Sequence, residues 1–278
     1  MLALPRSEEP RLETEMRLPL YQVDAFTDVP FRGNPAAVVI LDHWLEDDVL
    51  QAIAAENNLS ETAFVIPDTS VAKLRWFTPS IEVDLCGHAT LATAHVLFRD
   101  LPSCDTIAFD TKSGRLNVSR DGHWLTLDFP ARLATPTAFT VELVRALNVT
   151  PREVLIVEAS KRLVAVLHLD EQVRRLKPDM ARVAELDAQG VYVTAAASDV
   201  DFVSRVFLPK RGIAEDPVTG AAHCTLVPYW ASRLGKTRLT AKQVSARGGD
   251  LVCELRGERV AISGKAVDYL RGEISIGV

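Results

Sequence analysis

Two short segments of the chain place a glycine and polar side chains at the start of an apolar helical pattern. Gly87-His88 opens the run GHATLATAHVLF, and Thr219-Gly220 opens GAAHCTLVPYW. The N–H groups at a helix N-terminus are unpaired and carry a partial positive charge, so they bind carboxylates and developing oxyanions. If the two segments face each other, both helix ends act on one small anion. Turn chemistry alone is the alternative reason for each glycine.

Three side chains beside these helix starts are candidates for chemistry. His88 lies in a first helical turn, where the dipole disfavours the protonated ring; a neutral imidazole would hydrogen-bond a substrate oxygen or relay a proton. A capping or packing role explains it equally. Asp216 precedes the second helix, and would either cap it or orient a cationic group. Cys86 precedes Gly87, where the helix end would lower its pKa; a small buried apolar residue is the alternative.

The two helix starts occupy equivalent places in a repeated pattern. Three signals recur in the same order: RWFTP and RVFLP 130 residues apart, the helix-opening glycines 133 apart, and the glycines at Gly114 and Gly249 135 apart. Each signal alone is weak, and coincidental strand–turn–strand punctuation would produce any one of them. Their common order and slowly drifting offset indicate an internal duplication.

The elements that must position these residues also recur. Hairpins are predicted around Asp121-Gly122 and around Arg256-Gly257, and residues 47–57 and 178–189 have helical spacing. The glycine-led helices are apolar nearly all round, so they must be buried. We therefore expect an α+β fold of two pseudo-symmetric halves, each a mixed β-sheet rolled around a central helix. The predicted boundaries are a flexible extension (1–16), an N-terminal half (17–135) and a C-terminal half (136–278) whose last strand crosses back.

Composition excludes several other classes of protein. Apolar residues make up 47% of the chain, enough for a sizeable core, and the net charge of −6 without any basic block argues against nucleic-acid binding. The four cysteines lack CxxC spacing, which argues against a structural zinc site or a disulfide framework and favours a reducing, cytoplasmic compartment. We expect no transmembrane span and no signal peptide.

Four motifs in order resemble the PhzF-like isomerase family of phenazine biosynthesis: VDAFTDVPFRGNPAAVV, NNLSETAFV, FTPSIEVDLCGHATLATAHVLF and EDPVTGAAHC. The resemblance covers the chain from about Leu18 onward. It implies a fold like that of diaminopimelate epimerase, with the site between the halves. It also implies no metal, no organic cofactor and, commonly, a homodimer.

The resemblance further implies three catalytic residues: Glu61 of the SET context as acid/base, His88 of GHAT and Asp216 of DPVTG. By pattern alone Glu61 is an ordinary loop glutamate. The residues expected to bind substrate are Gly87, Thr219, Gly220 and Cys86. The function implied is a cofactor-independent isomerase that moves a proton on a small carboxylate-bearing molecule. The phenazine enzymes have a serine directly after DPVTG, where this chain has Ala221, so the phenazine precursor itself is not the expected substrate.

Two other functions remain open at this point. Epimerases and proline racemases of this fold use two cysteines, one at each helix start. Here the position equivalent to Cys86 is Thr219, so a thiol-assisted racemase would have to pair Cys86 with Asp216 or Glu61. A non-catalytic small-molecule binding protein of the same fold is the second alternative. A hydrolase is disfavoured, because the chain has no GxSxG elbow and no metal-ligand cluster in its sequence.

Overall fold

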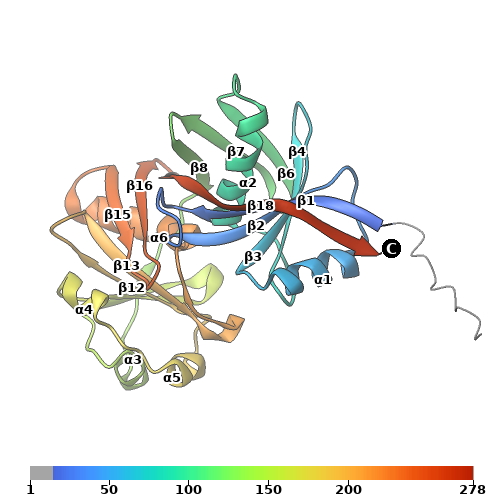
Figure 1. Ribbon diagram of the computed structural model, residues 1–278. Helices are drawn as coiled ribbons and strands as arrows, with labels where there is room; N and C mark the ends of the chain where they lie inside the picture. The colour runs from blue at the N-terminus through green and yellow to red at the C-terminus, as the bar shows by residue number, and fades with distance from the viewer. Residues whose placement is uncertain (1–14, 278) are drawn as a thin grey trace, which may run out of the picture.

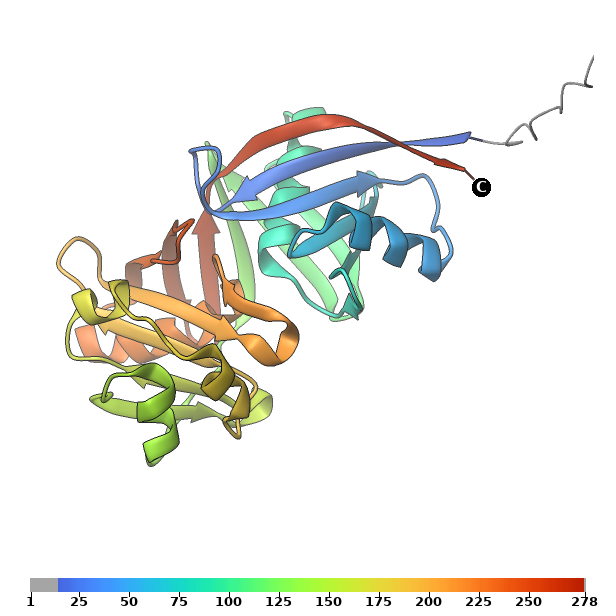
Figure 2. The ribbon, with the colours of Figure 1, turned by 60° about the horizontal axis from the view of Figure 1, so that its bottom comes forward.

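The computed structural model describes residues 15–277, which form two halves of matching architecture (Figures 1 and 2). Residues 1–14 and 278 lie outside the described residues, and with them most of the expected extension. The first strand, β1, begins at Glu15, so the sheet starts inside the segment assigned to that extension. The expected α+β architecture of two halves is confirmed.

The first half consists of eight strands and two helices. Its strands are β1 (Glu15–Ala25), β2 (Asn34–Ile40), β3 (Glu61–Ile66), β4 (Ala72–Phe77), β5 (Glu82–Val83), β6 (Thr106–Thr111), β7 (Gly114–Asp121) and β8 (Trp124–Pro130). Its helices are α1 (Asp47–Asn57) and α2 (Gly87–Asp100).

The second half repeats this order with extra short helices. Its strands are β9 (Thr135–Pro136), β10 (Glu153–Val157), β11 (Arg162–Val166), β12 (Val191–Ala196), β13 (Phe202–Leu208), β14 (Ile213–Asp216), β15 (Arg238–Gln243), β16 (Gly249–Arg256), β17 (Arg259–Gly264) and β18 (Ala266–Gly277). Its helices are α3 (Val141–Leu147), α4 (Asp170–Arg174), α5 (Met180–Glu185) and α6 (Gly220–Leu234), with 3-10 turns η1 (Glu158–Ser160) and η2 (Pro209–Arg211).

Strand pairing repeats from one half to the other. β2 and β3 pair in parallel, as do β11 and β12. β4 pairs in parallel with β6, and β13 with β15. The hairpin β7–β8 corresponds to β16–β17. The repeated sequence signals therefore correspond to repeated topology, which is what an internal duplication produces.

Both predicted hairpins form, but each turn lies one residue later than expected. In each hairpin the glycine is the first of the two loop residues. Gly122 has a φ of 57°, and Gly257 has a φ of 62°. Asp121 and Arg256, which the sequence placed in the turns, are instead the last residues of their strands. The positive φ belongs to the first loop position, and glycine adopts it without strain.

The central helices are buried as their composition requires. Ten of the 14 residues of α2 and nine of the 15 residues of α6 are buried. The hydroxyls of the buried Thr90 and Thr93 donate to the carbonyls of Cys86 and Ala89, at 2.6 and 2.7 Å. Threonine thus satisfies its own polar group inside an apolar helix. In residues 15–277 no helix has the length and apolar character that spanning a membrane would need.

The two halves share strands at two places. β8 of the first half pairs with β17 of the second, and β18 leaves the second half to pair with β1 along its whole length. Figure 2 shows β18, in red, running beside β1, in blue. One continuous sheet therefore runs through the molecule and sets how the starts of α2 and α6 lie relative to each other.

Candidate functional site

The N-termini of α2 and α6 meet where the halves join. A Cβ atom on Gly87 would lie 3.8 Å from the Cα of Gly220, and one on Gly220 would lie 3.9 Å from the Cα of Gly87. Cys86 and Thr219 are the N-cap residues, and neither side chain accepts a hydrogen bond from its helix. The two helix ends singled out in the sequence thus adjoin, and two partial positive charges act on one region.

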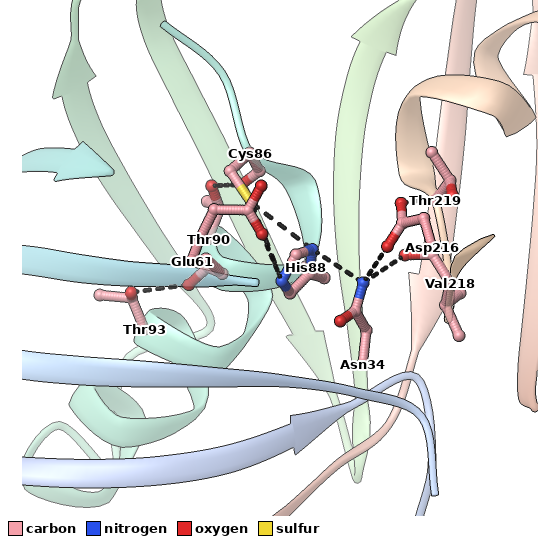
Figure 3. Close-up of polar contacts among 10 residues, drawn as sticks. Asn34, Glu61, Cys86, His88, Thr90, Thr93, Asp216, Val218 and Thr219 are labelled. Carbon is pink, nitrogen blue, oxygen red and sulfur yellow. Dashed lines mark hydrogen bonds and ion pairs between the residues drawn. The ribbon is translucent and has the colours of Figure 1, made fainter. Parts of the chain in front are cut away.

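Glu61 and His88 come from different elements of the first half and lie side by side (Figure 3). Glu61 is the first residue of β3, and His88 is the second residue of α2. Glu61 Oε2 and His88 Nε2 are 3.2 Å apart, with side chains only 14% and 6% exposed. Oε2 makes no aligned hydrogen bond within residues 15–277. A nearly buried carboxylate oxygen without such a bond can accept a proton from a ligand.

The Cys86 thiol differs from its expected state. Its Sγ is 3.5 Å from His88 Nδ1, and the residue is 6% exposed. Burial and the neighbouring charge of Glu61 raise the pKa of Cys86 to about 11. The expectation that the helix end lowers this pKa is therefore wrong, because loss of solvation outweighs the helix dipole. At neutral pH the thiol stays protonated.

His88 also departs from expectation, because its pKa is raised rather than lowered. Burial disfavours the charged ring, but the charges of Cys86 and Glu61 more than offset it, and the pKa of His88 lies well above its usual value. Of these two neighbours Glu61 is the carboxylate, with Oε2 3.2 Å from His88 Nε2. A carboxylate in contact outweighs the helix dipole.

Asn34, at the start of β2, connects the halves and was not anticipated. Its Nδ2 donates to Asp216 Oδ1 at 2.8 Å and to the Val218 carbonyl at 2.9 Å, and lies 3.2 Å from His88 Nδ1. An amide nitrogen has two hydrogens, so these two acceptors determine its orientation. The signal in the sequence was an asparagine inside the apolar segment GNPAAVV.

Asp216 is held by side chains from both halves. Its Oδ2 accepts the hydroxyl of Thr219 at 2.5 Å, and Oδ1 accepts the Asn34 amide. Asp216 is 8% exposed, and burial raises its pKa to about 6, with His88 opposing the shift and Glu61 adding to it. Figure 3 shows a continuous path from Glu61 through His88 and Asn34 to Asp216. The chain of contacts couples protonation in one half to the other.

Gln243 and His223 hold the short loop between Asp216 and the start of α6. Gln243 Oε1 accepts the backbone N–H of Thr219 at 2.8 Å, and Nε2 donates to the backbone carbonyl of Asp216 at 2.6 Å. His223 Nδ1 donates to the Thr219 carbonyl at 2.8 Å, and burial lowers its pKa to about 4, so it stays neutral. Nothing in the local sequence distinguished Gln243, a single glutamine at the end of a strand.

The site also offers donors that a metal could use. One ligand atom each of Glu61, Cys86 and His88 lies within 4.8 Å of the other two. Zinc accepts all three donor types, but the Cys86 thiol would first have to lose a proton that its pKa of about 11 retains. The expectation of a cofactor-free site stays a prediction.

A small pocket borders the helix starts. It has a volume of about 40 Å³ and is lined by Leu85, Gly87, Phe129, Pro130, Arg132, Ala221 and Cys224. Residues of both halves contribute to it. Ala221, where the phenazine enzymes have serine, therefore lies at the place where the two helix ends adjoin.

Comparison with known proteins shows the family of this chain. The family model of phenazine biosynthesis-like proteins (PhzC-PhzF) matches residues 23–272. The chain belongs to this family. Two proteins of Pseudomonas aeruginosa named as uncharacterized isomerases are 52% and 53% identical, each over 94% of this chain and 100% of the relative. A human phenazine biosynthesis-like domain-containing protein is 38% identical over 94% of this chain and 100% of its own length.

Solved structures place the fold within the PhzF family. A PhzF family protein from Enterococcus faecalis has a TM-score of 0.90 at 47% identity, over 93% of this chain and 99% of that one. A hydroxyproline epimerase from Agrobacterium vitis has a TM-score of 0.60 at 11% identity, over 94% of this chain and 93% of that one, which indicates a shared fold alone. The expected epimerase-like architecture of this PhzF family member is thus confirmed.

Proposed function

We propose that this PhzF family protein is a cofactor-independent isomerase that moves a proton on a small carboxylate-bearing substrate. The observation that carries the proposal is the Glu61–His88 pair, 3.2 Å apart and nearly buried beside two adjoining helix ends. A general base needs a poised acceptor, and charge that develops on the substrate needs fixed donors in a water-poor place. Both are present within one small region.

The proposed reaction keeps its protons in balance. Glu61 Oε2 removes a proton from a carbon of the substrate, and the electron pair moves toward an oxygen held at the starts of α2 and α6. The positive charge of the protonated His88 stabilises the negative charge that develops on this oxygen. The proton then returns from Glu61 to another carbon, so product and substrate are isomers. Asn34, held by Asp216 and the Val218 carbonyl, lies against the ring of His88 and limits where it can move.

Replacing Glu61 with glutamine tests the proposal. Glu61→Gln preserves the shape of the side chain but cannot take the proton, so turnover should fall by about 10²- to 10⁴-fold. The measurement is proton NMR in D₂O of a panel of small carboxylates, following deuterium that enters at carbon. Glu258→Gln, an exposed loop position, is the matched control and should exchange like the wild type. Undiminished exchange by a folded Glu61→Gln would refute the assignment.

The thiol-assisted racemase makes a different prediction for Cys86. A buried thiol with a pKa of about 11 is a poor base at neutral pH. We therefore expect Cys86→Ala to keep carbon exchange within about tenfold of the wild type, and iodoacetamide to react slowly with the native protein. Complete loss of exchange in Cys86→Ala, with the fold intact, would favour the racemase instead. Binding without exchange of any bound compound would favour the non-catalytic alternative.

A further inference from the structure

Arg162 is a buried cation with no anion beside it. Among the Lys and Arg side chains of residues 15–277, it alone is buried, at 7% exposed. No carboxylate of the described residues lies within ion-pair distance of it, and its Nε has no hydrogen-bond partner there. A buried charge without a counter-charge strongly disfavours the folded state. The buried Asp24 shows the contrast, because its side chain pairs with Arg247 at 2.7 Å.

The strand that carries Arg162 directs it toward the central helix of its half. Side chains alternate between the faces of a strand. In β11, Val164 and Val166 belong to the core that surrounds α2 and α6, whereas Ala165 packs in the outer core. Arg162 shares the face of Val164 and Val166, and its guanidinium stacks on the ring of Tyr192 at 5.8 Å.

Two further arginines link Arg162 to the catalytic side. The pKa of Arg211, at the end of η2, is lowered by partial loss of solvation and by the charge of Arg162. Tyr192 and Glu61 oppose this lowering. Arg211 is thus within electrostatic range of both Arg162 and Glu61. Burial raises the pKa of Tyr192, and the charges of Arg162 and Arg132 oppose this rise. Arg132 also lines the pocket at the helix ends. Neither Arg211 nor Arg132 has a carboxylate partner among the described residues.

We infer that Arg162 binds the anionic group of the substrate and is a specificity-determining residue of this site. The inference rests on the proposed function for the kind of ligand, a carboxylate. The free Nε–H is one of the two parallel donors with which a guanidinium holds a carboxylate. The bound anion supplies the counter-charge that Arg162 lacks among residues 15–277. Arg211 and Arg132 add positive potential around it.

Ligand-dependent thermal unfolding tests this assignment without knowledge of the substrate. The probes are acetate, benzoate and succinate, each compared with its neutral amide at constant ionic strength. We expect at least one carboxylate, and not its amide, to raise the Tm of the wild type. In Arg162→Met this shift should disappear, with the apparent Kd raised at least about tenfold. Arg145→Met, at an exposed position of α3, is the matched control and should keep the whole shift.

Two more variants make the outcome decisive. Arg162→Lys keeps the charge but loses the forked geometry, so it should bind the carboxylate more weakly than the wild type even if Arg162→Met folds poorly. Glu61→Gln should bind at least as tightly as the wild type, because it removes a nearby negative charge, while it loses carbon exchange. A full carboxylate shift in Arg162→Met or Arg162→Lys would overturn the inference and leave the proposed isomerase intact. The role of Arg162 is equally overturned if no carboxylate stabilises the wild type more than its amide does.

Discussion

Burial and close charges set the protonation states of individual residues in this site. Cys86 and His88 lie in contact at a helix N-terminus, yet burial raises the pKa of Cys86 while the neighbouring negative charge raises that of His88 against the effect of burial. At neutral pH the result is a neutral thiol, a protonated imidazole and a facing carboxylate, Glu61. His88 Nδ1 can then donate to the Cys86 sulfur, and the opposite edge of the ring faces Glu61. Both N–H groups of the ring are then paired within the protein, and the imidazolium acts on its surroundings through its positive charge.

Asp216 makes stability depend on pH in a defined direction. Its pKa is about 6 when folded, against 3.8 ordinarily, so the folded protein favours its protonated form. This contribution is complete below pH 3.8 and is lost as the pH rises through about 6, by about 3 kcal/mol for a shift of this size. Asp216→Asn, which stays neutral, should remove that dependence in urea unfolding between pH 4 and 7.

The exposed Asp105 supplies the control for this experiment. Asp105→Asn should leave the pH profile unchanged, since it removes an exposed carboxylate and keeps the buried Asp216. A profile for Asp216→Asn that matches the wild type between pH 4 and 7 would mean that Asp216 ionises normally in the folded protein.

At the scale of elements, the arginine of each repeated RxF motif forms an ion pair with a glutamate, and we call each pair a clamp. Arg75 binds Glu82 through both oxygens, at 2.7 and 2.9 Å, and Arg205 binds Glu215 likewise, at 2.7 and 2.8 Å. Each guanidinium also lies 5.1 Å from the ring of the phenylalanine two residues later. The glutamates lie in β5 and β14, the short strands that lead into α2 and α6. The clamp therefore positions both helix starts.

Removing one clamp should weaken the fold and the site together. Arg205→Met leaves Glu215 half-buried without its partner, directly beside Asp216. We expect a loss of about 2 kcal/mol in the free energy of unfolding by urea, together with slower carbon exchange. Arg256→Met, which breaks only the exposed pair with Glu254, should cost less than about 1 kcal/mol. Equal losses in the two variants would show that the clamp has no special role.

At the scale of the whole molecule, the shared sheet makes the two halves depend on each other. β8 pairs with β17 and β1 with β18, and Asn34 binds Asp216 across the junction. Neither half keeps all its strand partners without the other. Glu61 and His88, the pair proposed to be catalytic, and Arg162 of the second half consequently hold a constant relation, as preorganised chemistry requires.

A single cooperative unfolding transition is the expected consequence. Of the four tryptophans, Trp230 alone lies in the second half, so the fluorescence of Trp230→Phe reports on the first half only. Its urea midpoint should coincide with the midpoint of the same variant by far-ultraviolet circular dichroism. Two separate midpoints would mean that the halves unfold independently and that the strands between them contribute little.

The sequence by itself determined the features that are local. The helix starts at Gly87 and Gly220 are where the pattern places them, because an apolar run after a glycine encodes a buried helix within a few residues. The duplication was visible as well, because each of the motifs repeated about 130 residues apart is itself a short local pattern. Resemblance to a family, not pattern, singled out Glu61.

Only the tertiary structure decided which groups touch and which protons they keep. Asn34 meets Asp216 across 182 residues, and the carboxylate of Glu61 reverses the effect of the helix dipole on His88. Nothing in the sequence singled out Arg162, whose burial and lack of a carboxylate partner within residues 15–277 follow from packing. The pKa of a side chain depends on its solvation and on the distances to nearby charges. These depend on how segments pack in space, which residue spacing along the chain does not give.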